Sequence, residues 1–125
     1  MSERELTLAR AGFEAWRRGD FAAVEQLVDP AATWRWFERG EWDCSDRAEI
    51  MSTLRERHAQ GFAEGQLEFI DAGPDRVVLV SHPSRIGGED WPDETATVLS
   101  FREGKVVQMQ DYRTTGDALA AAQAT

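Results

Sequence analysis

Asp111 is the side chain whose position in the sequence points most directly to acid/base chemistry. After a glutamate–glycine turn, residues 105–113 alternate as a β-strand does, and Val107, Met109 and Asp111 fall on one face. A carboxylate on an apolar face must be paired, hydrogen-bonded or neutral, or the face must line a cavity. In a cavity its pKa rises towards neutrality, which suits a general acid or base. The alternative is a structural ion pair with Arg113 or another arginine at the rim of the sheet.

His82 is the second candidate for proton transfer. It alternates with Val78 and Val80 along a predicted strand, so it shares an otherwise apolar face with them. A neutral imidazole there could pair with Asp111 across the sheet. The alternative is a core or interface histidine with one satisfied hydrogen bond. Pro83 follows directly and predicts a bend or bulge at this point.

His58 shares a helical stripe with Ile50 and Leu54, which recur every four residues. We assign it to the substrate pocket. The alternative is a histidine at a helix end near the core margin, where its charge favours the C-terminal end of the helix dipole.

No metal or cofactor is expected from the motifs in this chain. The two histidines lack carboxylates at metal-ligand spacing, and neither an HExxH motif nor an EF-hand is present. The single cysteine, Cys44, excludes both a disulfide framework and a cysteine-rich metal site. The sequence also lacks a glycine-rich phosphate-binding loop, because Gly87-Gly88 is followed by acidic residues that would repel phosphate.

Aromatic residues are the expected wall of a binding pocket. Trp34 and Trp36 share one face of a predicted strand, and we place Phe13, Trp16 and Met109 with them. Walls of this kind suit a flat, apolar or aromatic small molecule. The alternative is that these side chains fill the core themselves and leave no space for a ligand.

Composition narrows the classes of partner. The 125 residues fit one domain, residues 1–125, and carry a formal net charge of -9 with a pI near 4.7. Nucleic acids and anionic membrane surfaces both require basic patches, so neither is an expected partner. The charged N-terminus does not resemble a signal peptide, and no apolar run reaches membrane-spanning length. We therefore expect a soluble cytoplasmic protein.

The elements that must position these residues divide into helices followed by strands. Apolar periodicity predicts a first helix ending at Gly19, a second beginning after Asp20, and a third capped by Ser45 or Asp46. Alternating patterns predict strands, and a short helix should close the chain. The predicted strands cover residues 31–37, 66–71, 76–85, 94–102 and 105–113, and the closing helix residues 118–122. This segregation predicts an α+β fold with helices on one face of a curved antiparallel sheet.

Two stretches carry a family resemblance that covers most of the chain. RRGDFAAVEQLVDPAATWRW at residues 17–36 and GKVVQMQDYR at residues 104–113 resemble the nuclear transport factor 2-like superfamily, in its SnoaL-like, polyketide cyclase-like branch. The resemblance implies a cone-shaped sheet wrapped around three N-terminal helices and enclosing an apolar pocket. It also implies a homodimer formed through the outer face of the sheet.

The same resemblance bears on activity, although the superfamily includes isomerases, cyclases, dehydratases, epoxide hydrolases and proteins without enzymatic activity. The three positions that resemble the functional residues of ketosteroid isomerases are Gly12, Trp36 and the neighbourhood of Thr97, and none carries the required group. SnoaL-like cyclases have an acid/base aspartate on the last strand, where Asp111 looks equivalent. We therefore expect cofactor-free isomerisation, cyclisation or dehydration. The alternatives are a non-catalytic ligand-binding module and a dimerisation domain with a filled pocket.

Overall fold

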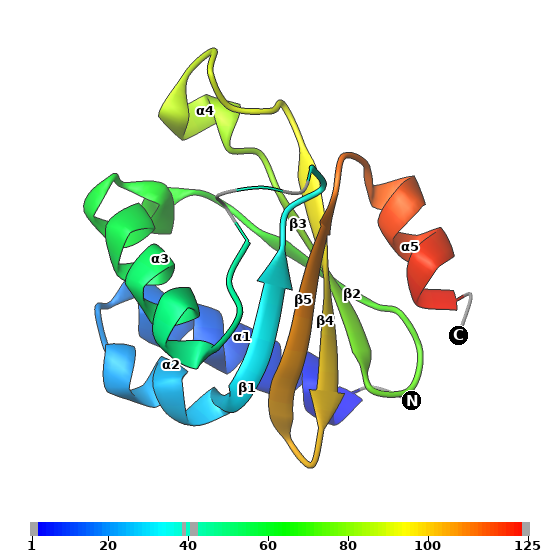
Figure 1. Ribbon diagram of the computed structural model, residues 1–125. Coiled ribbons are helices and arrows are strands. Elements are labelled where there is room, and N and C mark those ends of the chain that lie inside the picture. The colour runs from blue at the N-terminus through cyan, green and yellow to red at the C-terminus, as the bar shows by residue number, and fades with distance from the viewer. Residues whose placement is uncertain (1–2, 39, 41–42, 124–125) are drawn as a thin grey trace.

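A computed structural model describes residues 3–38, 40 and 43–123 (Figure 1). In the described residues the longer helices precede most of the strands, which is the predicted α+β order, and a last helix closes the chain. The elements are α1 (Glu3–Arg17), α2 (Phe21–Leu27), β1 (Val28–Arg35), α3 (Arg47–Ala59), η1 (Phe62–Glu64), β2 (Glu68–Asp71), β3 (Arg76–Ser81), α4 (Ser84–Gly87), β4 (Thr95–Arg102), β5 (Lys105–Tyr112) and α5 (Thr115–Gln123).

The helix boundaries follow from local capping chemistry. Gly19 adopts a left-handed conformation with φ +81° just after α1, which a residue with a side chain rarely does. The Asp20 side chain then accepts a hydrogen bond from the Ala23 amide and starts α2. At α3, Asp46 accepts from the Glu49 amide at 3.0 Å, while the Glu49 carboxylate accepts from the Ser45 amide at 2.7 Å. These caps confirm the predicted starting points of α2 and α3.

The five strands form one curved sheet in the order β1-β5-β4-β3-β2. Strands β2 to β5 pair antiparallel, as their short connections predict. β1 differs, because it pairs parallel with β5 and so makes the sheet mixed rather than wholly antiparallel. Between β1 and β5 the chain forms α3 and three further strands. A connection of that length imposes no hairpin geometry on the two strands. Hairpin reasoning therefore could not fix the direction of β1.

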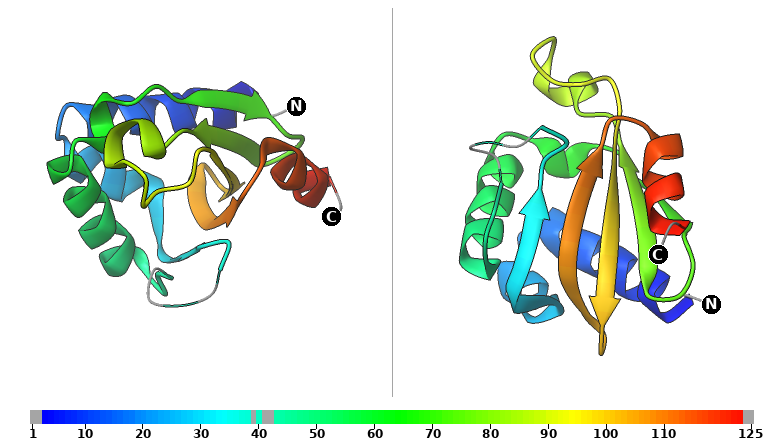
Figure 2. Two further views of the ribbon diagram at one scale, coloured as in Figure 1. Left: turned by 90° about the horizontal axis from the view of Figure 1, so that it is seen from above. Right: turned by 45° about the vertical axis from the view of Figure 1, so that its right-hand side comes forward.

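Helices lie on both sides of the sheet (Figure 2). α1, α2 and α3 lie on the concave side, as the α+β prediction required, and α5 packs on the opposite side. The α1 side buries a cluster that includes Ala9, Val77 and Leu99, and the α5 side buries one that includes Val78 and Ala118. Because successive residues of β3 enter different clusters, both faces of this strand are apolar.

A β-bulge in β5 changes which residues face the helices. Phe101 pairs with Val106, but Ser100 pairs with Gln108, so Val107 is an extra residue in the ladder. The bulge places Val106, rather than Val107, on the inner face with Met109 and Asp111. The prediction that Val107 shares the face of Asp111 was therefore wrong.

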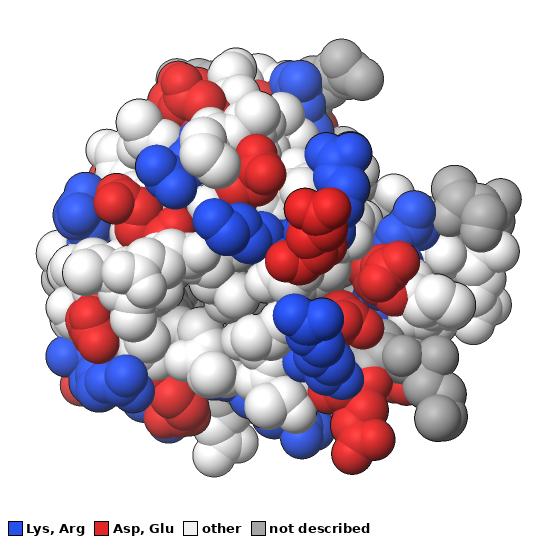
Figure 3. All heavy atoms as spheres, turned by 90° about the horizontal axis from the view of Figure 1, so that it is seen from below, with Lys and Arg blue, Asp and Glu red and all other residues white. Residues whose placement is uncertain are grey.

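Charges of both signs are interspersed on the face seen from below (Figure 3). Within the described residues, no helix has the length and apolar character needed to cross a membrane.

Candidate functional site

A cavity of about 460 Å³ lies between the three N-terminal helices and the inner face of the sheet. This volume falls within the range of small-molecule pockets. Five residues that the sequence assigned to a pocket wall line it: Phe13, Trp16, Trp34, Trp36 and Met109. These side chains surround the cavity without filling it, so a ligand has room there. Substrate binding by these residues stays a prediction.

Asp111 lies on the sheet floor of this cavity and is only 2% exposed. The Thr97 hydroxyl, directly opposite on β4, donates to its Oδ1 at 2.5 Å. The Trp34 indole N–H donates to both carboxylate oxygens at 3.1 Å. Burial raises the pKa of Asp111 to about 6, although the two hydrogen bonds and the charge of Arg57 oppose that rise. A carboxyl group with this pKa can both release and accept a proton near neutral pH.

Arg113 does not provide the ion pair that was the alternative for Asp111. Its guanidinium pairs with Glu38 and lies 4.4 Å from the centre of the Phe37 ring. The donors to Asp111 are neutral groups, so its carboxylate is buried without an ion pair to Arg113.

Trp34 connects Asp111 to the edge of the sheet. Its main chain forms a two-way bridge with Cys44, with N–O distances of 3.0 and 2.7 Å. This bridge fixes the backbone of β1 and therefore the direction in which the indole projects. Trp34 was predicted as a wall residue, but its hydrogen bond to Asp111 was not, because β1 and β5 are 77 positions apart at this contact.

Arg57 is a site residue that the sequence reasoning missed. Its guanidinium carbon lies 4.9 Å from the Trp34 ring centre, 5.3 Å from that of Trp91 and 5.9 Å from that of Trp36. Burial lowers the pKa of Arg57 from its usual value, while the charge of Asp111 opposes that change. The helical pattern held a signal for it, since Arg57 follows Ile50 by seven positions and therefore shares its face.

His58 lies at the packing of the helices, outside the set of residues that line the cavity. Its ring packs against Trp16 and Phe21, with centroid distances of 6.1 and 5.3 Å, and its Nε2 is 3.2 Å from the Arg17 carbonyl oxygen. These contacts match the alternative of a histidine at the core margin and give no support to a role in substrate binding.

His82 lines the cavity, but not through the strand pattern that the sequence suggested. β3 ends at Ser81, one residue before it, because Pro83 starts the helical turn α4. Val78 and Val80 belong to the cluster on the α5 side, so the predicted shared face was wrong. The His82 Nδ1 lies 3.0 Å from the Asp93 carbonyl oxygen, and among the described residues no hydrogen bond joins His82 to Asp111.

A metal site is not supported by the described side chains, among which no group of three or more histidine, cysteine, aspartate or glutamate residues could hold an ion. A second cavity of about 450 Å³ is lined by α3 and by Asp43 and Cys44, and Arg57 borders it as well as the first.

Replacing Thr97 with Val should raise the pKa of Asp111 further above 6 and lower the free energy of unfolding at neutral pH by about 1–3 kcal/mol. The substitution preserves shape but removes a hydrogen bond to a buried charge. Urea unfolding and NMR titration of the carboxyl carbon measure the two effects. Thr95→Val is the matched control, since Thr95 also lines the cavity but bonds the neutral Ser81 hydroxyl. Equal pKa values for Asp111 in the two variants would contradict the assigned role of Thr97.

Comparisons with known proteins place this geometry in a family. A family model described as the SnoaL-like domain matches residues 9–109. Among curated protein sequences no significant match was found. A nuclear transport factor 2-like protein of unknown function from Burkholderia xenovorans is similar in structure, with a TM-score of 0.68, 24% identity, and coverage of 89% of this chain and 83% of that one.

Two further solved structures share the fold at lower identity. A candidate polyketide cyclase from Sinorhizobium meliloti has a TM-score of 0.63 and 15% identity, over 85% of this chain and 94% of that one. TerC, co-crystallised with polyporic acid, has a TM-score of 0.60 and 16% identity, over 98% of this chain and 100% of that one. These likenesses show the fold, and the family-model match covers most of the sequence. The chain therefore belongs to the SnoaL-like domain family, within the nuclear transport factor 2-like fold.

Proposed function

We propose that this protein binds a small apolar or aromatic molecule in the 460 Å³ cavity and that Asp111 transfers protons to and from it. The reaction would be a cofactor-free isomerisation, cyclisation or dehydration. One observation carries the proposal: the Asp111 carboxyl group is buried on the floor of an otherwise largely apolar cavity, and this burial raises its pKa to about 6.

The chemistry follows from the surroundings of Asp111. At neutral pH most of the population carries the carboxylate, which can remove a proton from a carbon next to a substrate carbonyl and return it elsewhere. The Thr97 hydroxyl and the Trp34 indole hold the carboxylate in one orientation. His82, at another part of the same cavity, is the candidate for a second proton-transfer group. The fold of a candidate polyketide cyclase, and that of a protein crystallised with polyporic acid, support a ligand-binding cavity.

A second candidate function is ligand binding without catalysis. It is favoured by the hydrogen bonds that Asp111 accepts from Trp34 and Thr97, since those bonds also join three strands of the sheet. In that case Asp111 would be a structural link, and the same cavity would only store or deliver its ligand.

The assembly and location that we propose are a single domain, residues 1–125, acting as a homodimer in the cytoplasm. The family resemblance supports the dimer. Light scattering of the purified chain would test it, and a monomer at micromolar concentration would contradict it.

A ligand of the expected class should raise the melting temperature. At one hundred times its dissociation constant it adds about 2.7 kcal/mol to the stability of the folded state, which corresponds to roughly 10 °C. The measurement is a thermal-shift screen with small aromatic compounds, polyketide-like compounds, steroids and terpenes. Leu79→Trp is the matched variant, because the larger ring projects from β3 into the cavity and should remove the shift. If no compound in the panel raised the melting temperature, the aromatic side chains would serve only as core.

A further inference from the structure

We propose that Arg57 binds an anionic oxygen of the ligand, so that the ligand is an organic acid with a flat apolar body. The anionic group would be a carboxylate or an acidic hydroxyl. This inference rests on the proposed function, because it names the chemical class of molecule that the same cavity would take.

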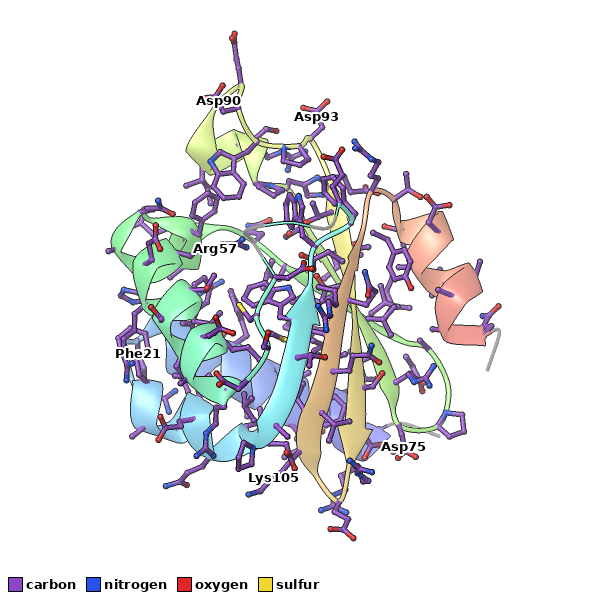
Figure 4. The ribbon with its side chains drawn as sticks, in the orientation of Figure 1. Phe21, Arg57, Asp75, Asp90, Asp93 and Lys105 are labelled. Carbon is purple, nitrogen blue, oxygen red and sulfur yellow. The ribbon has the colours of Figure 1, made fainter. Side chains whose placement is uncertain are left out.

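The position of Arg57 makes its guanidinium part of the cavity wall. It projects from α3 towards the strands, beneath α4 (Figure 4). It lines the main cavity together with Trp34, Trp36 and Trp91, three rings of the described residues that lie within 6 Å of its guanidinium carbon. The aromatic contacts restrict the long side chain, which lowers the conformational entropy that a ligand would have to remove on binding.

Contact with an aromatic ring and recognition of an acid are two different interactions of a guanidinium group. Attraction to an aromatic ring acts through the π face of that ring. Recognition of a carboxylate acts through N–H groups in the guanidinium plane, which match two oxygens at once. The ring contacts of Arg57 therefore position, on the cavity wall, a cation whose geometry suits a carboxylate.

Asp111 does not take the place of the ligand acid. Its carboxylate accepts hydrogen bonds from the neutral Thr97 and Trp34 groups, and in the described part of the chain it forms no salt bridge within 4.0 Å. Among the described contacts, Arg57 and Asp111, which both line the cavity, influence each other through their charges. A polar group of the ligand can thus contact Arg57 while its neighbouring atoms face Asp111.

The charge of Arg57 also selects against other ligands. A cluster of tryptophan rings near a carboxylate would suit a cationic ligand, but the guanidinium already lies among these rings and would repel one. The rest of the wall is mainly apolar, with Phe13, Leu79 and Leu99 among the lining residues, and suits the uncharged body of the ligand.

The test compares three probes of one shape and different charge: naphthoate, naphthamide and naphthylmethylammonium. Isothermal titration calorimetry of the full chain at neutral pH should show naphthoate binding about 10- to 100-fold more tightly than naphthamide, with the cation weakest. In Arg57→Gln the preference for naphthoate over naphthamide should fall to within about 3-fold. Arg55→Gln is the matched control and should keep the preference, because Arg55 lies on the same helix over the Phe21 ring and lines neither cavity.

Each other outcome overturns the inference in a distinguishable way. Equal binding of naphthoate and naphthamide by the unmodified chain would refute the acid preference and leave the proposed function standing. A preference that survives in Arg57→Gln would move the anion site away from Arg57. Absence of binding by all three probes would count against both proposals. If Arg57→Gln does not fold, the probe series on the unmodified chain still decides the ligand class, and Arg57→Lys, which keeps the charge without the planar fork, should retain only part of the preference.

Discussion

Asp111→Asn should lower turnover by about 10²- to 10⁴-fold, the usual contribution of a positioned general acid or base. The substitution removes the titrating group and preserves its volume. The measurement is the rate with a substrate found through the ligand screen, determined across the pH range. In the unmodified protein the rate should rise as pH increases through about 6, where Asp111 becomes the carboxylate that accepts the proton.

The amide can keep the local hydrogen bonds, which makes this substitution a fair test of chemistry. Its oxygen can accept from the Trp34 indole, and its nitrogen can donate to the Thr97 hydroxyl, which rotates to accept. Ligand binding should therefore persist in Asp111→Asn. A variant that retains full turnover would exclude Asp111 as the proton-transfer group. If the unmodified protein binds ligands but converts none of them, the binding-only function is favoured.

The parts of the fold that the sequence predicted well depend on neighbouring residues. Caps at Asp20 and Asp46 are formed by side chains within three positions of the amides that they accept from. The hairpin between β4 and β5 follows from its short turn in the same way. Information of this kind is local, and it specified the helix starts and the antiparallel strands.

The pairing of Asp111 with Thr97 depends on one extra residue in β5, Val107, which local patterns did not reveal. Arg102 pairs with Lys105 across the hairpin turn, and without the bulge that register would place Asp111 opposite Ala96. The extra residue Val107 shifts the register by one, so that Thr97 faces Asp111 and donates to it. No composition rule placed a bulge at a pair of valines, and the hydrogen bond therefore could not be predicted.

Long-range contacts account for the remaining differences. The sequence selected His58 for the pocket because it follows Leu54 by four positions. Helical rotation brings Arg57 closer to the centre of the Ile50–Leu54 stripe and turns His58 towards α1 and α2. Choosing between the two required knowledge of which helices lie beside α3, and that depends on the packing of the whole domain.

The stability of the protein should carry a pH signature of Asp111 of about 3 kcal/mol. Its pKa is about 6 in the folded protein against an ordinary value of 3.8, and this difference of about two pKa units sets the size of the effect. Below the ordinary value both states hold the proton. Between the two values only the folded state holds it, so the free energy of unfolding falls as pH rises through this window. Above about pH 6 the full cost of the buried charge is present.

Asp111→Asn lacks this term, and urea unfolding from about pH 4 to about pH 7 measures it by difference. The unmodified protein should lose about 2.4 of these 3 kcal/mol relative to the variant across that range, because the unfolded carboxyl is already partly ionised at pH 4 and titration of all other groups cancels in the comparison. Asp43→Asn is the control of opposite sign. The Trp36 amide that donates to Asp43 lowers the pKa of that carboxyl, so its stabilisation is present at neutral pH and is lost on acidification. If the free energy of unfolding changed with pH in the same way in Asp111→Asn and in the unmodified protein, Asp111 would have an ordinary pKa. The proposed acid/base role would then lose its physical basis.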